Sequence, residues 1–175
     1  RARSSFMMRS SVPSSVLAMF LTYRRSEMCV IIIDYRCDMT NWRQWLKIAH
    51  ISDLHFSSSL FVPRWADNVT RTIEEERPDL LVVTGDLTTD GYASEFEAAK
   101  SFLEGLEVED MLVVPGNHDS RNLGYTIFEE IIGPRFPTYV GKGVTVVGLD
   151  STEPDVEDGH VGREHYGPIR EQFAG

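Results

Sequence analysis

Apolar runs alternate with amphipathic segments along most of the chain, in a pattern typical of an α/β protein. Continuous apolar runs rich in β-branched residues predict buried strands, at residues 46–51, 80–84, 111–114 and 144–149. Apolar positions at helical spacing predict helices, at residues 65–77, 94–106 (with Ser94 as the N-cap) and from 167 onward. The last strand is expected to pair with residues 138–140 across a Gly-Lys-Gly turn. Strands separated by helices describe a sheet that is covered on both faces.

Residues 1–38 differ in composition from the rest of the chain. They hold six Arg against three acidic residues, whereas residues 39–175 hold 11 basic and 24 acidic side chains. Their apolar runs are shorter than the ~20 residues that a membrane-spanning helix needs. An Arg- and Ser-rich, acid-poor start resembles an organelle transit peptide. We favour the alternative that residues 1–38 are a disordered or non-native extension ahead of Met39, and that residues 39–175 form the domain.

The charge and the cysteines narrow the classes of partner. A formal charge of −10 disfavours nucleic acid, because a phosphate backbone would be repelled. Both cysteines, Cys29 and Cys37, lie outside residues 39–175, so this part can form neither a disulfide framework nor a Cys-ligated metal site. We expect a cytoplasmic protein with no membrane partner.

Polar residues follow each predicted strand directly. They are Asp53 and His55, then Asp86, then Asn117 and His118, and finally Asp150. Ligands of an open α/β sheet bind at the carboxyl ends of its strands, so residues roughly 30 positions apart can converge there. Asp53 and His55 are two apart on a segment that we expect to be extended, which would place both side chains on one face. Turn formation is the alternative explanation; it accounts for Asp150 but not for the two histidines.

The residue types suit a metal centre. A set of Asp, His and Asn side chains fits Mn, Fe or Zn. Asp86 has two oxygens and can bridge two metals held ~3.5–4 Å apart. Asn117 offers a neutral oxygen, which limits the negative charge in the site. Gly85 and Gly116 would let the backbone pass close to metal or phosphate.

Three motifs carry a family resemblance. Asp53-x-His55, Gly85-Asp86 and Gly116-Asn117-His118-Asp119, in this order, resemble the calcineurin-like metallophosphoesterase superfamily over roughly residues 46–152. The resemblance implies an α/β fold, a β-sandwich flanked by helices, of which this chain holds the N-terminal βαβαβ half plus one or two further strands. It also implies that Asp53 and His55 bind one divalent metal ion, that Asp86 bridges two, and that Asn117 binds the second.

The same resemblance implies a mechanism. A hydroxide that bridges the two metals attacks the phosphorus of a small phosphorylated substrate. His118 lies outside the metal shell and protonates the leaving oxygen or stabilises the phosphoryl charge, and Asp119 orients it. Asn117, His118 and Arg121 would contact the substrate; a solvated surface arginine is the alternative reading of Arg121.

Further motifs of the superfamily do not occur in this sequence. A later His and a Gly-His-x-His would supply three more metal ligands, so we expect the N-terminal part of such a domain, which binds metal weakly and is nearly inactive alone. We expect His50 to be a packed or hydrogen-bonded core residue. We place His160 and His165 in loops near the substrate mouth.

Two classes of function remain open at this point. The first is metal-dependent hydrolysis of a phosphodiester or phosphomonoester of a small substrate, with manganese among the candidate metals. The second is a scaffold of the same fold that binds proteins, or a fragment without activity. Metal content separates an enzyme from a scaffold, and a scaffold has no need to keep His118 and Asp119.

Overall fold

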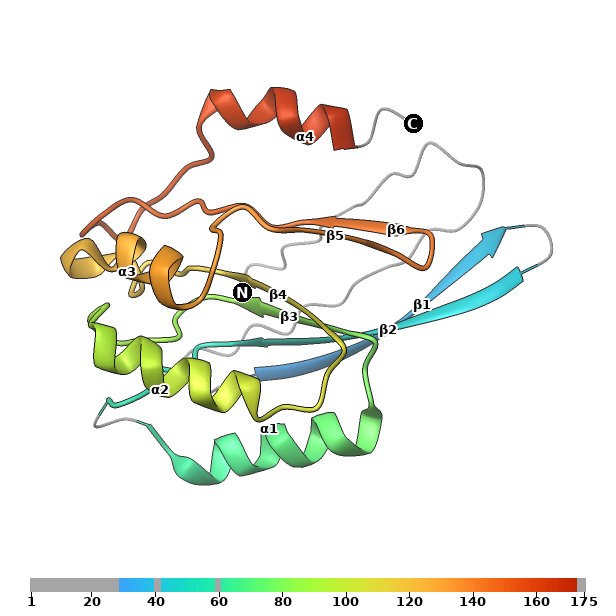
Figure 1. Ribbon diagram of the computed structural model, residues 1–175, viewed down its shortest axis with the longest axis horizontal. Helices are drawn as coiled ribbons and strands as arrows, with labels where there is room; N and C mark the ends of the chain where they lie inside the picture. The colour runs from blue at the N-terminus through green and yellow to red at the C-terminus, as the bar shows by residue number, and fades with distance from the viewer. Residues whose placement is uncertain (1–28, 40–41, 59–60, 173–175) are drawn as a thin grey trace, which may run out of the picture.

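A four-stranded sheet forms the centre of the molecule (Figure 1). The computed structural model describes residues 29–39, 42–58 and 61–172. The strand order is β1–β2–β3–β4, and β2, β3 and β4 are parallel to one another, while β1 is antiparallel to β2. The bounds are β1 (Cys29–Met39), β2 (Trp42–Ser52), β3 (Leu80–Thr84) and β4 (Asp110–Val114). The three parallel strands confirm the predicted α/β class.

Residues 29–38 of strand β1 belong to the segment that the sequence sets apart as an extension. The strand pairs with β2 along its whole length, from Cys29 opposite Ser52 to Met39 opposite Trp42. Residues 1–28 of the predicted extension lie outside the described residues.

Two crossover helices cover one face of the sheet (Figure 1). They are α1 (Pro63–Glu76) and α2 (Ala93–Glu104), and both coincide closely with the predicted helices. Their apolar stripes pack into one core with side chains of β2 and β3; its buried members include Ala49, Ile51, Val69, Ile73, Leu81, Val83, Phe96, Ala99 and Leu103. Helix α2 begins at Ala93, one residue before the predicted N-cap Ser94. The N-cap residue is therefore Tyr92.

A hairpin covers the opposite face. Strands β5 (Thr138–Gly141) and β6 (Val144–Val147) pair as predicted, but they form a separate two-stranded sheet. Tyr139, Val144 and Val146 of this hairpin pack against a second core cluster, which consists of Leu46, Leu80, Leu112 and Val114. The expected coverage of both faces is therefore met by helices on one side and by a β layer on the other.

The remaining elements lie beyond the carboxyl ends of the parallel strands or after the hairpin. They are the short helices η1 (Arg121–Leu123), α3 (Gly124–Ile131), η2 (Arg163–His165) and α4 (Tyr166–Gln172). Phe128 of α3 meets Phe96 of α2 edge to face, with ring centroids 6.0 Å apart, and both side chains are fully buried. Among the described residues, no helix has the length and apolar character needed to cross a membrane.

Gly85 and Gly116 bring the loops after β3 and β4 into direct contact. A Cβ on Gly85, whose φ is +79°, would overlap the backbone of Gly116. A Cβ on Gly116 would in turn overlap the backbone nitrogen and Oδ1 of Asp86. The sequence suggested that these glycines make room for metal or phosphate; in the structure each makes room for the other loop.

The buried carboxylate of Asp119 joins the same two loops. Its oxygens accept hydrogen bonds from the backbone nitrogens of Leu87 (3.2 Å), Thr88 (2.8 Å) and Gly116 (2.9 Å), and from Oγ1 of Thr88 (2.8 Å). Burial raises the pKa of Asp119 to about 6, and these donors act in the opposite direction by favouring the carboxylate. The side chain is thus a structural link between β3 and β4.

We expect Gly116→Ala to destabilise the fold by about 2 kcal/mol, because the added methyl group has no space beside Asp86. The matched control is Gly167→Ala, where nothing lies within 4 Å of the new Cβ. Urea denaturation of both variants measures the effect. Equal stability of the two variants would show that the loops can separate at no cost.

Asp119→Asn should cost about 2 kcal/mol, because an amide keeps one acceptor oxygen and turns its NH₂ group toward backbone donors. The control Asp67→Asn, on the exposed face of α1, should stay within about 0.5 kcal/mol of the wild type. Thermal unfolding of the three proteins tests this. A midpoint for Asp119→Asn equal to that of the control would contradict the structural link.

Candidate metal centre

Three of the residues that the sequence singles out have left-handed backbone conformations. The φ angles are 61° at Asp53, 46° at His55 and 52° at Asp86. The prediction of an extended segment at Asp53 and His55 is wrong, because both residues have left-handed φ angles in the turn that follows the end of β2. Such conformations are costly for residues other than glycine and cluster at functional sites.

Backbone hydrogen bonds hold this turn against the loop after β3. The backbone nitrogen of Asp53 donates to the carbonyl oxygen of Gly85 (3.2 Å), and that of His55 donates to the carbonyl oxygen of Asp86 (2.9 Å). The parallel pairing of β2 and β3 is thereby continued past the strand ends. It brings the first two motifs into contact, as their positions in the sequence predict.

Consecutive carbonyl groups hold the two histidine rings. Nδ1 of His55 lies 3.0 Å from the carbonyl oxygen of Thr88, and Nδ1 of His118 lies 2.7 Å from that of Thr89. A carbonyl oxygen can only accept, so Nδ1 carries the proton in both rings and Nε2 is left to bind a metal or a substrate. The rings meet edge to face, with centroids 4.7 Å apart.

Asp86 completes a group that fits a divalent metal. One potential ligand atom from each of His55, Asp86 and His118 lies within 4.8 Å of the others. Oδ2 of Asp86 is 3.9 Å from Nε2 of His55, and its Oδ1 accepts a hydrogen bond from the backbone nitrogen of His118 (3.1 Å). Metal-binding histidines commonly donate their second ring N–H to a carbonyl, as both do here. The side chains of His55, Asp86 and His118 therefore fit a divalent metal ion.

The other two predicted ligands stand next to this group. Asp53 is exposed, and its Oδ2 accepts a hydrogen bond from Oγ of Ser52 at 2.5 Å. Asn117 is half-buried in the loop after β4 and directly precedes His118. The structure thus brings His55, Asp86 and His118 together, with Asp53 and Asn117 on the flanking turns.

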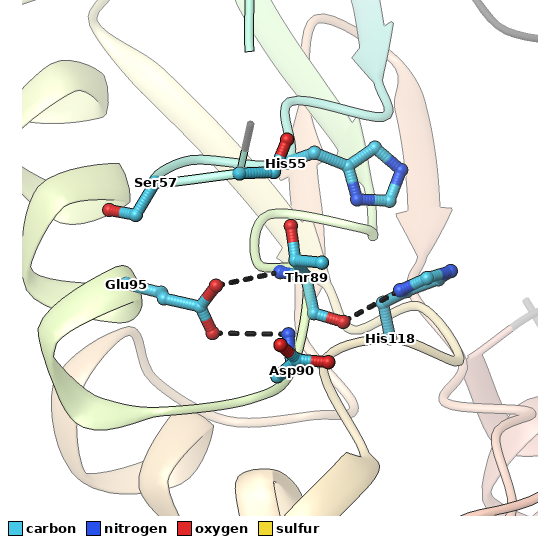
Figure 2. Close-up of a pocket in the computed structure, with 7 residues that line it drawn as sticks. His55, Ser57, Thr89, Asp90, Glu95 and His118 are labelled. Carbon is cyan, nitrogen blue, oxygen red and sulfur yellow. Dashed lines mark hydrogen bonds between the residues drawn. The ribbon is translucent and has the colours of Figure 1, made fainter. Parts of the chain in front are cut away.

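A cleft of about 450 Å³ opens beside the histidines (Figure 2). Its lining consists of His55, Ser57, Ser58, Thr89, Asp90, Glu95 and His118. Glu95, which is buried at the start of α2, was not among the predicted site residues. It lies three residues after the N-cap Tyr92, and because Tyr is not a usual N-cap residue the sequence carries no capping-box signal that marks Glu95.

The contacts of Asp119 and Arg121 differ from those that the sequence suggested. We expected Asp119 to orient His118, yet Nδ1 of His118 faces Thr89 and the carboxylate of Asp119 binds the backbone of both loops. Nη1 of Arg121 donates to the same Thr89 carbonyl at 3.2 Å, and its Nη2 donates to Glu157 at 3.4 Å. Arg121 therefore lies close behind His118.

The other histidines and Asp150 have partners of their own. Nε2 of His50 lies 2.6 Å from Oγ1 of Thr84, which agrees with the predicted hydrogen-bonded role, and burial lowers the pKa of its imidazole. His160 pairs with Glu153, and His165 stacks on Phe136 with ring centroids 4.1 Å apart. The buried carboxylate of Asp150 accepts from Arg135 and Thr152, as expected of a turn residue.

Comparison with known proteins agrees with this geometry. Residues 46–170 match the calcineurin-like phosphoesterase family. A probable cyclic nucleotide phosphodiesterase of Synechococcus sp. is 30% identical over 124 residues, which cover 66% of this chain and 48% of that protein. A glycerophosphodiester phosphodiesterase of Enterobacter lignolyticus is 34% identical over 99 residues, which cover 51% of this chain and 34% of that protein.

A third relative, a probable cyclic nucleotide phosphodiesterase of Rhodococcus erythropolis, is 30% identical over 142 residues. These residues cover 71% of this chain and 44% of that protein, so the chain spans about half the length of the relatives, or less. The matched region contains every residue of the candidate metal centre. The chain belongs to the calcineurin-like phosphoesterase family.

Proposed function

We propose that the activity of this protein is metal-dependent hydrolysis of a small phosphodiester, and that the cleft beside His55 and His118 takes part in it. The observation that carries the proposal is the group of His55, Asp86 and His118, whose potential ligand atoms lie within 4.8 Å of one another. Two divalent ions, of Mn, Fe or Zn, would supply a nucleophilic water at neutral pH and neutralise charge on the phosphoryl group.

The residues around the cleft take the roles that their contacts allow. His55 and Asp86 are ligands in this proposal, joined by the flanking Asp53 and Asn117. Nε2 of His118 faces the substrate, because its Nδ1 is held by Thr89. As an imidazolium, with Nδ1–H still bound to Thr89, His118 would donate a hydrogen bond from Nε2 to the phosphoryl group, give that proton to the leaving oxygen and return to the neutral Nδ1–H form. Asn117 and Arg121 support substrate binding, the latter through a guanidinium beside the same carbonyl.

The choice of a small diester rests on two features. The named relatives act on cyclic nucleotides or glycerophosphodiesters, which are small diesters. The residues that line the cleft include the polar Ser57, Ser58 and Asp90, whose side chains suit the polar groups of such substrates. The acidic balance of the chain disfavours a nucleic acid. A cytoplasmic location completes the proposal.

Replacing His55 and His118 one at a time should distinguish the metal ligand from the proton donor. We expect His55→Ala to lose bound metal, and His118→Ala to keep metal while kcat falls by about 10²- to 10⁴-fold. His160→Ala is the control, because this exposed side chain pairs only with Glu153 among its described ion-pair partners. Metal analysis by mass spectrometry and steady-state kinetics are the measurements. Loss of metal in His118→Ala would instead make His118 a ligand.

The substrate class can be tested with a matched pair of aryl esters. Bis(p-nitrophenyl) phosphate should be hydrolysed faster than p-nitrophenyl phosphate, and a chelator should abolish the activity. The series Mn²⁺, Ni²⁺, Zn²⁺ and Mg²⁺ identifies the metal. Protein that binds no metal and hydrolyses neither ester would contradict the proposal and favour the alternatives, a scaffold or an inactive fragment.

A further inference from the structure

We propose that Glu95 is a positioning residue for both His55 and His118, and that it acts through two consecutive peptide groups. The inference deepens the proposed function and rests on it, since it concerns how the same two imidazoles are aimed. Neither histidine touches Glu95 through a direct hydrogen bond among those that the described residues show.

The carboxylate of Glu95 is buried and accepts three backbone hydrogen bonds. Oε1 accepts from the nitrogen of Thr89 (3.2 Å), and Oε2 accepts from the nitrogens of Asp90 (3.1 Å) and Tyr92 (3.0 Å). Figure 2 shows the first two of these bonds on the side of the loop that faces away from the histidines. Only the bond to Tyr92 belongs to an ordinary capping box; the other two fix the loop.

The planarity of the peptide bond carries this constraint across the loop. In a trans peptide the C=O and the N–H point in opposite directions. The N–H of Thr89 shares a plane with the carbonyl of Thr88, which holds Nδ1 of His55. The N–H of Asp90 shares a plane with the carbonyl of Thr89, which holds Nδ1 of His118. Each oxygen of Glu95 thus aims one carbonyl at one imidazole.

The arrangement also affects the electronic state of the rings. A carboxylate that accepts from the N–H of a peptide polarises this peptide and makes its carbonyl a better acceptor. A stronger acceptor at Nδ1 fixes the tautomer and makes Nε2 a better electron donor. The charge of Glu95 therefore reaches both imidazoles, although the loop lies between the carboxylate and the two rings.

Asp119 performs a different task on the neighbouring peptides. Its bonds to the nitrogens of Leu87 and Thr88 pin the planes whose carbonyls belong to Asp86 and Leu87. These two carbonyls accept from the backbone nitrogens of His55 and Phe56. Asp119 consequently holds the backbone of the turn after β2, whereas Glu95 holds the side-chain rings.

The test compares the Glu95→Gln and Glu95→Ala variants of the 175-residue chain with the wild type. Long-range ¹H–¹⁵N correlation spectra of the metal-free protein report the tautomers of His55 and His118. We expect a single Nδ1–H tautomer for both rings in the wild type, a mixture in Glu95→Gln and a larger change in Glu95→Ala. Metal affinity or kcat should fall by about 10- to 100-fold.

Two control variants separate positioning from stability. Glu97→Gln changes an exposed carboxylate on the same helix, and Phe96→Leu lowers stability through the core without a polar contact. Both should keep the wild-type tautomers. Tautomers that stay unchanged in both Glu95 variants, or that shift equally in Phe96→Leu, would overturn the inference. Failure to hydrolyse any phosphoester, with tautomers that shift only in the Glu95 variants, would refute the proposed function and leave the positioning role standing.

Discussion

The loop between Gly85 and Tyr92 is the constraint on which the site depends. Its backbone is irregular and partly buried, so its N–H groups find no partners in a helix or a sheet. Two buried carboxylates supply them instead: Asp119 accepts from Leu87 and Thr88, and Glu95 accepts from Thr89, Asp90 and Tyr92. The carbonyl groups of the same peptides are left on the opposite side, where they accept from the two histidine-bearing loops.

Satisfying the loop's N–H groups with buried carboxylates lowers the stability of the fold. Burial opposes the charged form of Asp119, and three left-handed residues, Asp53, His55 and Asp86, add backbone strain. A buried polar network contributes less to net stability than an apolar core of equal size would. The network does fix the orientation of its groups, because each hydrogen bond favours a nearly linear arrangement of donor, hydrogen and acceptor. The loop is therefore better explained by the orientation of His55 and His118 than by stability.

The sequence allowed the elements and the meeting of the motifs to be predicted, because both depend on side-chain pattern. Apolar runs located β3 and β4 within a residue, and Asp86 and His118 follow these strands as an α/β sheet requires. The contacts of Thr88 and Thr89 could not be predicted in this way, since every residue has a carbonyl group and nothing in the sequence marks which ones face a ring. Glu95 escaped notice because Tyr92 is not a usual N-cap residue, and because nothing in the sequence shows that the amides of Thr89 and Asp90 bind the same carboxylate.

The error about Asp119 has the same physical origin. A carboxylate that follows a histidine invites the inference that the two are paired, because neighbours in sequence are close in space. Yet the side chain of Asp119 is fully buried, while that of His118 reaches the cleft. The side chains of these two successive residues therefore point in different directions. The carboxylate that acts on His118 comes from α2 instead, and a planar peptide transmits its effect. His118 and Asp119 are neighbours in the motif because they share one turn. Which groups each side chain contacts is decided by the fold and not by this neighbourhood.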